Sequence, residues 1–505
     1  MGHRRARART RPPVPLNPDA ATRRNSMNDT TPRELDQIAD AAAAASALLD
    51  RTDEAVRAGW LRAIAVALDA QSSMLVGIAD DETALGTPRL AGELARTTAQ
   101  LRLFADVIEE GSYLEATIDH PNAAATPPIP DLRRMLRPIG PIAVFAASNF
   151  PFAFSIAGGD TASALAVGCA VIVKAHPGHP QTSASTARIV IDSLREAGAP
   201  EGAFAMVSGF DAGLSLVDHP AIRAVAFTGS VRGGRALLDR ISTRPDPIPF
   251  YGELGSLNPV VVTASADSEQ GAKLAAGLAA SFQLGVGQFC TKPGVVLVPH
   301  DSVLERELPQ YLSTQPRMLT PAIAGGFAGG NKRMREVSGI RVVTAAGDIG
   351  DGTSPMVAIT DVATLQANAD ALLEEVFGPF TLLVRYQGDA ELDAVLDLLP
   401  GSLTATVHSA DGEDVAALVR RLEPLAGRLL FGGWPTGVAV SWAQQHGGPW
   451  PSTNTQFTSV GATAVRRFQR PVAYQDAPDA VLPSALREEN PLRTPRRVDG
   501  VLVTP

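Results

Sequence analysis

The stretch IAVFAASNFPFAFSIAGGDTASALAVGCAVIV, residues 142–173, decides the fold class. It begins with an apolar run at Ile142–Ala146, continues through a predicted helix at Thr161–Val167 and ends in a second apolar run at Ala170–Val173. Two further short apolar runs follow between residues 203 and 227, and each precedes a predicted helix. Strands that alternate with helices in this way predict an α/β fold with a parallel sheet, at whose carboxyl edge dinucleotides commonly bind.

The segment before this stretch, residues 32–117, is predicted to be helical. Apolar residues recur there at helical spacing, and Thr31-Pro32 and Thr87-Pro88 are typical helix starts. Four prolines between residues 121 and 130 then predict a linker or an extended crossing. Residues 1–27 are rich in arginine and proline, and we expect a disordered basic tail rather than a targeting peptide or a nucleic-acid arm.

Composition narrows the class of protein and of partner. The chain has 505 residues, 45% of them hydrophobic and 19% charged, which predicts a folded chain of two or three domains. A net charge of −9 provides no general attraction for nucleic acid or for an anionic membrane surface, so neither is expected as a partner. No apolar run reaches transmembrane length, and the two cysteines are far apart, so we expect a cytoplasmic protein without a disulfide framework.

The chemistry is carried by six short motifs in a fixed order. No GxGxxG fingerprint follows the predicted strands, which disfavours the commonest Rossmann dehydrogenases. Each motif alone is weak evidence. The six are SNFP at 148–151, VK at 173–174, FTGS at 227–230, GELGSLNP at 252–259, GQFCT at 287–291 and EEVFGP at 374–379.

Together these motifs resemble the aldehyde dehydrogenase superfamily, from about residue 30 to about residue 480. The resemblance implies a Rossmann-type cofactor domain, an α/β catalytic domain and a small β oligomerisation arm. It also implies a homodimer or a homotetramer. The expected boundaries are 28–117 with 139–251 for the dinucleotide-binding domain, 252–459 for the catalytic domain, and 118–138 with 460–505 for the arm and C-terminal tail.

Cys290 is the expected nucleophile. A thiolate attacks carbonyl carbons readily and leaves as a thioester, and the Gly/Gln-containing loop would present this side chain to a cleft. We expect one fast-reacting cysteine with a lowered pKa. Cys169 lies in an apolar stretch and is interpreted as a core residue.

Two further catalytic residues are assigned by the resemblance. The side-chain amide of Asn149, with the backbone N–H of Cys290, would stabilise the oxyanion of the tetrahedral adduct. Glu253 would accept a proton from the water that releases the product, and its partly apolar surroundings predict a raised pKa.

The cofactor residues are likewise carried over by motif. Lys174 matches the lysine that reaches the adenosine ribose or a nearby phosphate. Gly229 and Ser230 match the turn that contacts the pyrophosphate at a helix N-terminus. Glu375 matches the residue that holds the nicotinamide ribose, and Phe377 the residue that packs close to the nicotinamide.

The expected cofactor preference rests on one position at which this chain differs from the family pattern. Many NAD-preferring members have a glutamate where this chain has Pro177, so a 2′-phosphate meets no repulsion, and Lys174 or His176 could attract it. We therefore expect NADP, or NAD and NADP with NADP favoured. No metal is expected, since no HExxH pattern exists and Pro177-Gly178 separates His176 from His179.

The substrate is expected to be 2,5-dioxovalerate (2-oxoglutarate semialdehyde). The KAHPGHP loop, the GELGSLNP stretch and WPTGVAV resemble a branch that contains dehydrogenases for this aldehyde and an NADP-dependent long-chain aldehyde dehydrogenase. A medium- or long-chain aldehyde and a catalytically inactive nucleotide-binding homologue are the alternatives. Lys292, next to the GQFCT motif, either assists an anionic substrate or faces solvent. The Gly/Pro/Trp-rich residues 430–451 predict loops at the floor of a substrate channel, and His446-Gly447-Gly448 lacks the GxSxG partner of an α/β-hydrolase.

Overall fold

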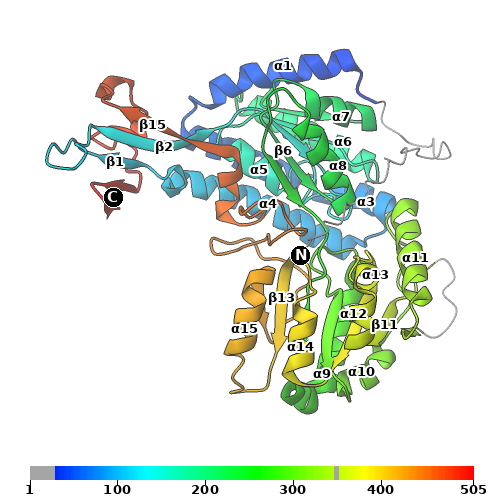
Figure 1. Cartoon of the computed structure of the whole chain (residues 1–505). Coiled ribbons are helices and arrows are strands. Elements are labelled where there is room, and N and C mark those ends of the chain that lie inside the picture. The colour runs from blue at the N-terminus through cyan, green and yellow to red at the C-terminus, as the bar shows by residue number, and fades with distance from the viewer. Residues whose placement is uncertain (1–28, 346–351, 505) are drawn as a thin grey trace, which may run out of the picture.

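The computed structural model of this chain describes residues 29–345 and 352–504, in which the strands form three sheets (Figure 1). The expected basic tail at residues 1–27 lies outside the described residues. The strands of the first sheet come from residues 142–253, those of the second from residues 260–431, and those of the third from both 117–138 and 469–503.

The first sheet confirms the parallel arrangement predicted from the sequence. Its strands have the order β5-β4-β3-β6-β7, and every neighbouring pair is parallel. The strands are β3 (Ile142–Phe145), β4 (Val171–Lys174), β5 (Phe204–Val207), β6 (Ala224–Thr228) and β7 (Phe250–Glu253).

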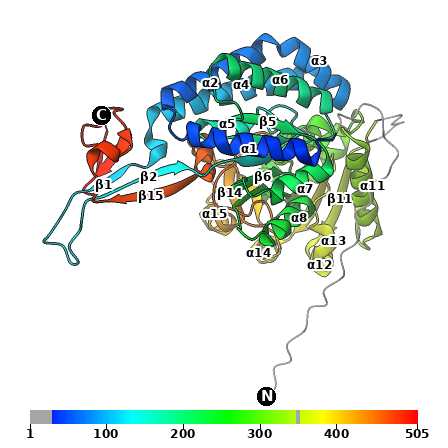
Figure 2. The same ribbon diagram turned by 90° about the horizontal axis from the view of Figure 1, so that it is seen from above.

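Helices cover both faces of this sheet, with α1, α7 and α8 in one layer and α2 to α6 in the other (Figure 2). Burial on both faces explains why β3 and β4 are almost wholly apolar. The helices are α1 (Pro32–Leu49), α2 (Glu54–Ala70), α3 (Ser72–Thr83), α4 (Thr87–Glu110), η1 (Ser112–Leu114), α5 (Gly159–Ala166), α6 (Pro180–Glu196), α7 (Phe210–Asp218) and α8 (Val231–Ser242).

The second sheet has seven strands in the order β10-β11-β12-β9-β8-β13-β14, parallel except for β10 at one edge. Its strands are β8 (Val260–Val262), β9 (Val295–Pro299), β10 (Arg341–Thr344), β11 (Met356–Asp361), β12 (Phe380–Tyr386), β13 (Ser402–His408) and β14 (Ala426–Phe431). Its helices are α9 (Ala264–Gln283), η2 (Leu284–Gly287), α10 (Val303–Glu307), η3 (Leu308–Tyr311), α11 (Pro321–Glu336), α12 (Val362–Ala367), α13 (Ala369–Leu372), α14 (Gly388–Leu396), α15 (Ala416–Leu422) and η4 (Glu423–Leu425).

The third sheet projects from the rest of the molecule as an arm (Figures 1 and 2). Its strands, in the order β15-β2-β1-β16-β17, are β1 (Thr117–Asp119), β2 (Leu132–Pro138), β15 (Gln469–Gln475), β16 (Arg496–Val498) and β17 (Val501–Val503). The 3₁₀ helices η5 (Ala462–Phe468), η6 (Asp479–Val481) and η7 (Ser484–Leu486) accompany them.

One expectation for this region was wrong. The prolines between residues 121 and 130 lie in the loop of a hairpin, because β1 and β2 pair antiparallel, and they do not form a linker. The C-terminal stretch belongs to the same sheet, since β16 pairs with both β1 and β17 and buries Arg496.

None of the described helices is, by itself, long and apolar enough to cross a membrane. Only α2 and α3 taken together meet that criterion, as a pair bent by 71°.

Candidate active site

The residues singled out at the strand ends meet at one edge of the first sheet. Asn149 follows β3, Lys174 ends β4, Gly229 and Ser230 follow β6, and Glu253 ends β7. Because all five strands are parallel, their carboxyl ends lie at the same edge. The first sheet therefore supplies one wall of the site.

Cys290 belongs to the part of the chain that forms the second sheet, and it lies in the predicted loop between a helix and an apolar strand. The chain leaves α9 through η2, where Gly285, Val286 and Gly287 all have positive φ, and then enters β9. A Cβ on Gly287 would lie 2.3 Å from the carbonyl oxygen of Gly378, so only glycine fits there. This turn fixes the position from which Cys290 is presented.

Asn258 fixes the Cys290 loop through side-chain hydrogen bonds. Its side-chain amide donates hydrogen bonds to the carbonyl oxygens of Cys290 (2.8 Å) and Lys292 (2.9 Å). Its Oδ1 accepts from the hydroxyls of Ser256 and Thr404. Asn258 is fully buried and has a φ of 50°, a conformation that asparagine tolerates better than most residues. The GELGSLNP motif therefore contains a structural residue, Asn258, whose role sequence reasoning did not predict.

Asn149 lies beside the thiol loop, as the oxyanion role requires. Its Nδ2 donates to the carbonyl oxygen of Gln288 at 3.0 Å, two residues before Cys290. One N–H of that amide is used in this bond, and the second can point to a bound substrate. The backbone oxygen of Asn149 accepts from Arg89 at 2.7 Å, which fixes the turn.

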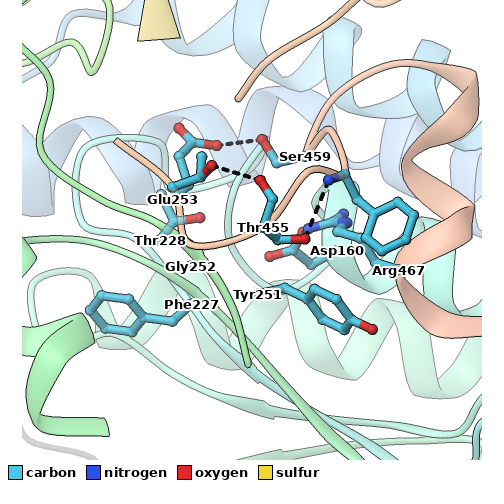
Figure 3. Close-up of a pocket in the computed structure, with 11 residues that line it drawn as sticks. Asp160, Phe227, Thr228, Tyr251, Gly252, Glu253, Thr455, Ser459 and Arg467 are labelled. Atoms are coloured by element: carbon cyan, nitrogen blue, oxygen red, sulfur yellow. Dashed lines mark hydrogen bonds and ion pairs between the residues drawn. The ribbon is translucent and has the colours of Figure 1, made fainter. Parts of the chain in front are cut away.

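His446 is the main residue that sequence reasoning missed. Its Nε2 lies 3.7 Å from the Sγ of Cys290 and 2.9 Å from the Oε1 of Glu253. The hydroxyl of Ser459 donates to the other carboxylate oxygen of Glu253 (Figure 3). Both His446 and Glu253 are buried. The loops at 430–451 thus place an imidazole between the nucleophile and the carboxylate.

The carboxylate side of the site is also rigidly supported. Glu253 lines a small cavity together with Tyr251 and Thr455, and a 2.7 Å ion pair between Asp160 and Arg467 closes the same cavity (Figure 3). The hydrogen bond from Ser459 to Glu253 joins the end of β7 to the loop that carries Ser459.

The electrostatics overturn two expectations. Burial raises the pKa of Glu253, but the charge of His446 and the hydrogen bonds from His446 and Ser459 outweigh it, so the pKa is lowered. Burial and then the charge of Glu253 raise the pKa of Cys290 well above its usual range, although Arg96 opposes this. The site at rest therefore pairs a thiol with a carboxylate, instead of a thiolate with a neutral acid.

Cys169 is a core residue, as expected. It is completely buried, its Sγ donates to the carbonyl oxygen of Phe468 at 3.3 Å, and burial raises its pKa to about 12. A buried thiol of this kind is unreactive. Cys290 is therefore the chemically available cysteine.

Gly229 and Ser230, which are expected to contact the cofactor, lie at an exposed helix N-terminus. Ser230 is the N-cap of α8, and its hydroxyl accepts from the backbone N–H of Gly233 at 3.1 Å. Gly229 and Ser230 are both exposed. An exposed helix N-terminus suits a pyrophosphate, because its dipole favours negative charge.

Glu375 lies near Cys290, in the part of the chain that forms the second sheet. Its Oε2 accepts from the backbone N–H of Ser256 at 3.2 Å, and a Cβ on Gly255 would lie 2.6 Å from the same oxygen. Gly255 therefore leaves room for this carboxylate. Phe377 is half-buried in the loop two residues later.

Lys292 does not face solvent. It is buried, and its Nζ donates to the carbonyl oxygen of Phe380 at 2.8 Å. Burial lowers the pKa of Lys292 and raises that of Glu375, while each charge stabilises the other. Lys292 thus acts on the predicted ribose-binding carboxylate.

The role of His176 beside a phosphate stays a prediction. Burial, followed by the charges of His179 and Lys174, holds the pKa of His176 well below its usual range, which disfavours a charged ring. Its Nδ1 accepts from the backbone N–H of Gly178 at 3.0 Å. Lys174 remains the basic group at the end of β4, with a pKa lowered by burial.

The catalytic cluster is the candidate metal-binding group among the described residues. Glu253, Cys290 and His446 offer one donor atom each, and these atoms lie within 4.8 Å of one another. Carboxylate, thiolate and imidazole are ligands of zinc. The same three groups have an evident use in thiol chemistry, and the absence of a metal cofactor stays a prediction.

Comparisons with known proteins agree with this geometry. A family model described as "Aldehyde dehydrogenase family" matches residues 9–315. The Alpha-ketoglutaric semialdehyde dehydrogenase 2 of Azospirillum brasilense is 46% identical, over 88% of this chain and 87% of that protein. The Alpha-ketoglutaric semialdehyde dehydrogenase of Acinetobacter baylyi is 39% identical, over 94% and 93%. The 1-pyrroline-5-carboxylate dehydrogenase from Thermus, solved with bound NAD, shares the fold with a TM-score of 0.74 at 22% identity, over 88% and 86%.

Proposed function

The chain belongs to the aldehyde dehydrogenase family and is an NAD(P)-dependent oxidoreductase that acts on an aldehyde, and from this premise we propose that it oxidises 2-oxoglutarate semialdehyde (2,5-dioxovalerate) to 2-oxoglutarate. The observation that carries the chemistry is the contact of Cys290 with His446 and of His446 with Glu253. The substrate is supported by the names of two relatives that match nearly the full chain at 46% and 39% identity.

The first step makes a bond between sulfur and carbon. The Cys290 thiol gives its proton to the pair formed by His446 and Glu253, whose nearest atom, the Nε2 of His446, lies 3.7 Å from the Sγ. The Sγ then attacks the aldehyde carbon, and the new oxyanion accepts hydrogen bonds from the Asn149 amide and the Cys290 backbone N–H. The raised thiol pKa is no obstacle, because the proton acceptor lies beside the thiol.

The later steps need a hydride acceptor and a water. Bound NAD(P)+ supplies the hydride acceptor. The exposed turn at Gly229 and Ser230 would hold its pyrophosphate, and Glu375, in the space left by Gly255, would hold its nicotinamide ribose beside Phe377. Oxidation leaves a thioester on Cys290. Glu253 then takes a proton from the water that hydrolyses it, a role for which a carboxylate with a lowered pKa is already ionised.

NADP is the proposed preference. The position where an acid would reject a 2′-phosphate is the exposed Pro177, and Lys174 is the basic group nearby. His176 contributes no charge. The kcat/KM for NADP is expected to exceed that for NAD, and a preference for NAD by more than about tenfold would contradict the proposal.

The arm is proposed to join copies of the chain into a dimer or a tetramer. β17 is an edge strand of the third sheet, and its side chains Val501, Leu502 and Val503 are exposed. An exposed apolar edge strand is a template for pairing with another strand.

The substrate is tested by comparing 2,5-dioxovalerate with a medium-chain aldehyde such as octanal. NADPH formation is followed by absorbance at matched concentrations, and the expected kcat/KM is higher for 2,5-dioxovalerate. A higher kcat/KM for octanal would instead favour a medium- or long-chain aldehyde dehydrogenase. No turnover of either aldehyde with either nucleotide would contradict the catalytic role itself.

A further inference from the structure

Two arginines of α4 lie on one face of that helix, close to the thiol. Arg89 and Arg96 are separated by two helical turns, with Glu93 between them. The guanidinium carbon of Arg89 lies 4.6 Å from the ring centroid of Phe289 and 5.3 Å from that of Phe150. The guanidinium carbon of Arg96 lies 5.3 Å from the ring centroid of Phe154.

The three phenylalanine rings form a contiguous group that extends from the residue before Cys290 to His446. Phe289 directly precedes Cys290, and its ring centroid lies 5.2 Å from that of Phe150. Phe150 in turn lies 5.3 Å from Phe154, whose ring centroid is 6.3 Å from that of His446. Since His446 contacts the Cys290 thiol, the two guanidinium groups lie against rings that adjoin the thiol loop and His446.

Both guanidinium groups have unused hydrogen-bond donors. The Nε and Nη1 of Arg89 and the Nε and Nη2 of Arg96 are buried and lack a hydrogen-bond partner in the part of the chain that the structure describes. The carboxylate between them makes no hydrogen bond to either guanidinium: the Oε1 of Glu93 accepts from the backbone N–H groups of Phe152 and Ala153, its Oε2 has no hydrogen-bond partner among the described residues, and its charge acts on both arginines. Burying an ionised group without a hydrogen-bond partner costs free energy. A ligand that binds beside these guanidinium groups would supply the missing partner.

We propose that Arg96, supported by Arg89, binds the carboxylate of a short aldehyde substrate while the aldehyde group reaches Cys290. A guanidinium presents two parallel N–H groups to a carboxylate, and the ring beneath it fixes its plane. The charge of Arg96 also reaches Cys290 and Glu253, which places it within range of the reacting atoms. The proposal rests on the proposed function, because only an aldehyde with an anionic end uses this subsite.

The activity test compares 2,5-dioxovalerate with pentanal, an uncharged aldehyde of the same chain length. Arg96→Gln should lower the ratio of the two kcat/KM values by about 50-fold relative to the wild type. Arg102→Gln is the matched control, because Arg102 is exposed on the same helix and pairs with Asp69. It should leave the ratio unchanged. Equal losses with both aldehydes in Arg96→Gln would overturn the proposal, since the residue would then serve the thiol or the fold.

A binding measurement on the wild type tests the subsite without relying on turnover or on the folding of a variant. Glutarate, an unreactive dianion, should slow the alkylation of Cys290 by iodoacetamide in the wild type, whereas 1,5-pentanediol should not. Absence of protection by glutarate would overturn the anion subsite. A wild type that prefers pentanal while glutarate still protects Cys290 would instead contradict the proposed substrate and leave the subsite standing.

Discussion

At the scale of single residues, His446 controls both the proton of Cys290 and the charge of Glu253. Its positive charge and its hydrogen bond lower the pKa of that carboxyl group. In His446→Asn, burial should therefore raise the pKa of Glu253, and the acidic limb of the pH profile of kcat/KM should move to higher pH. The value of kcat should fall by about 100-fold to 1,000-fold. An acidic limb at an unchanged pH would show that His446 only fills space.

Lys292 acts on the cofactor side of the same site. Its charge lowers the pKa of Glu375, which burial raises. Lys292→Met should leave Glu375 protonated at neutral pH and so weaken its hold on a ribose hydroxyl. The KM for NADP should rise at pH 7 and recover as the pH increases. A KM that is independent of pH in the variant would contradict this link between Lys292 and Glu375.

At the scale of elements, the loop that carries Cys290 depends on Asn258. Asn258→Ala removes two buried hydrogen bonds to carbonyl oxygens and places alanine at a φ of 50°. The free energy of unfolding in urea should fall by about 3 kcal/mol. Arg493→Ala is the control for the backbone, since Arg493 has a φ of 51° and an exposed side chain in the arm. An equal loss in both variants would assign the whole effect to backbone conformation.

The elements were largely predictable, and the contacts between them were not. The runs at Ile142–Ala146 and Ala170–Val173 mark β3 and β4 to within one residue, because buried parallel strands are continuous apolar stretches. His446 gave no such signal, because it lies 156 residues from Cys290 in a Gly- and Pro-rich loop without periodicity. The only sequence feature that marked it was a histidine followed by two glycines.

The pKa shifts were missed for the same reason. The direction for Glu253 depends on His446 and Ser459, which arrive from remote loops. The alternative in which Lys292 faces solvent was wrong, because its side chain is buried against the carbonyl of Phe380, a contact that local sequence does not encode. Motifs place the reacting groups, whereas their charge states depend on tertiary neighbours.

At the scale of the whole molecule, the arm should determine assembly. Leu502 lies on the edge strand β17 with 62% of its surface exposed, and an aspartate there should disfavour strand pairing between copies. Light scattering should show a smaller assembly for Leu502→Asp than for the wild type. Val66→Asp is the matched control, since Val66 is also 62% exposed but lies on α2. A mass that is unchanged in Leu502→Asp would exclude β17 from the interface.

The central claim is that Cys290 carries the acyl group during aldehyde oxidation. The most direct measurement stops the reaction of 2,5-dioxovalerate and NADP in acid and determines the masses of the cysteine peptides. The account predicts an acyl group on the Cys290 peptide, none on the Cys169 peptide, and loss of NADPH formation in Cys290→Ala. NADPH formation that persists in Cys290→Ala would contradict the account.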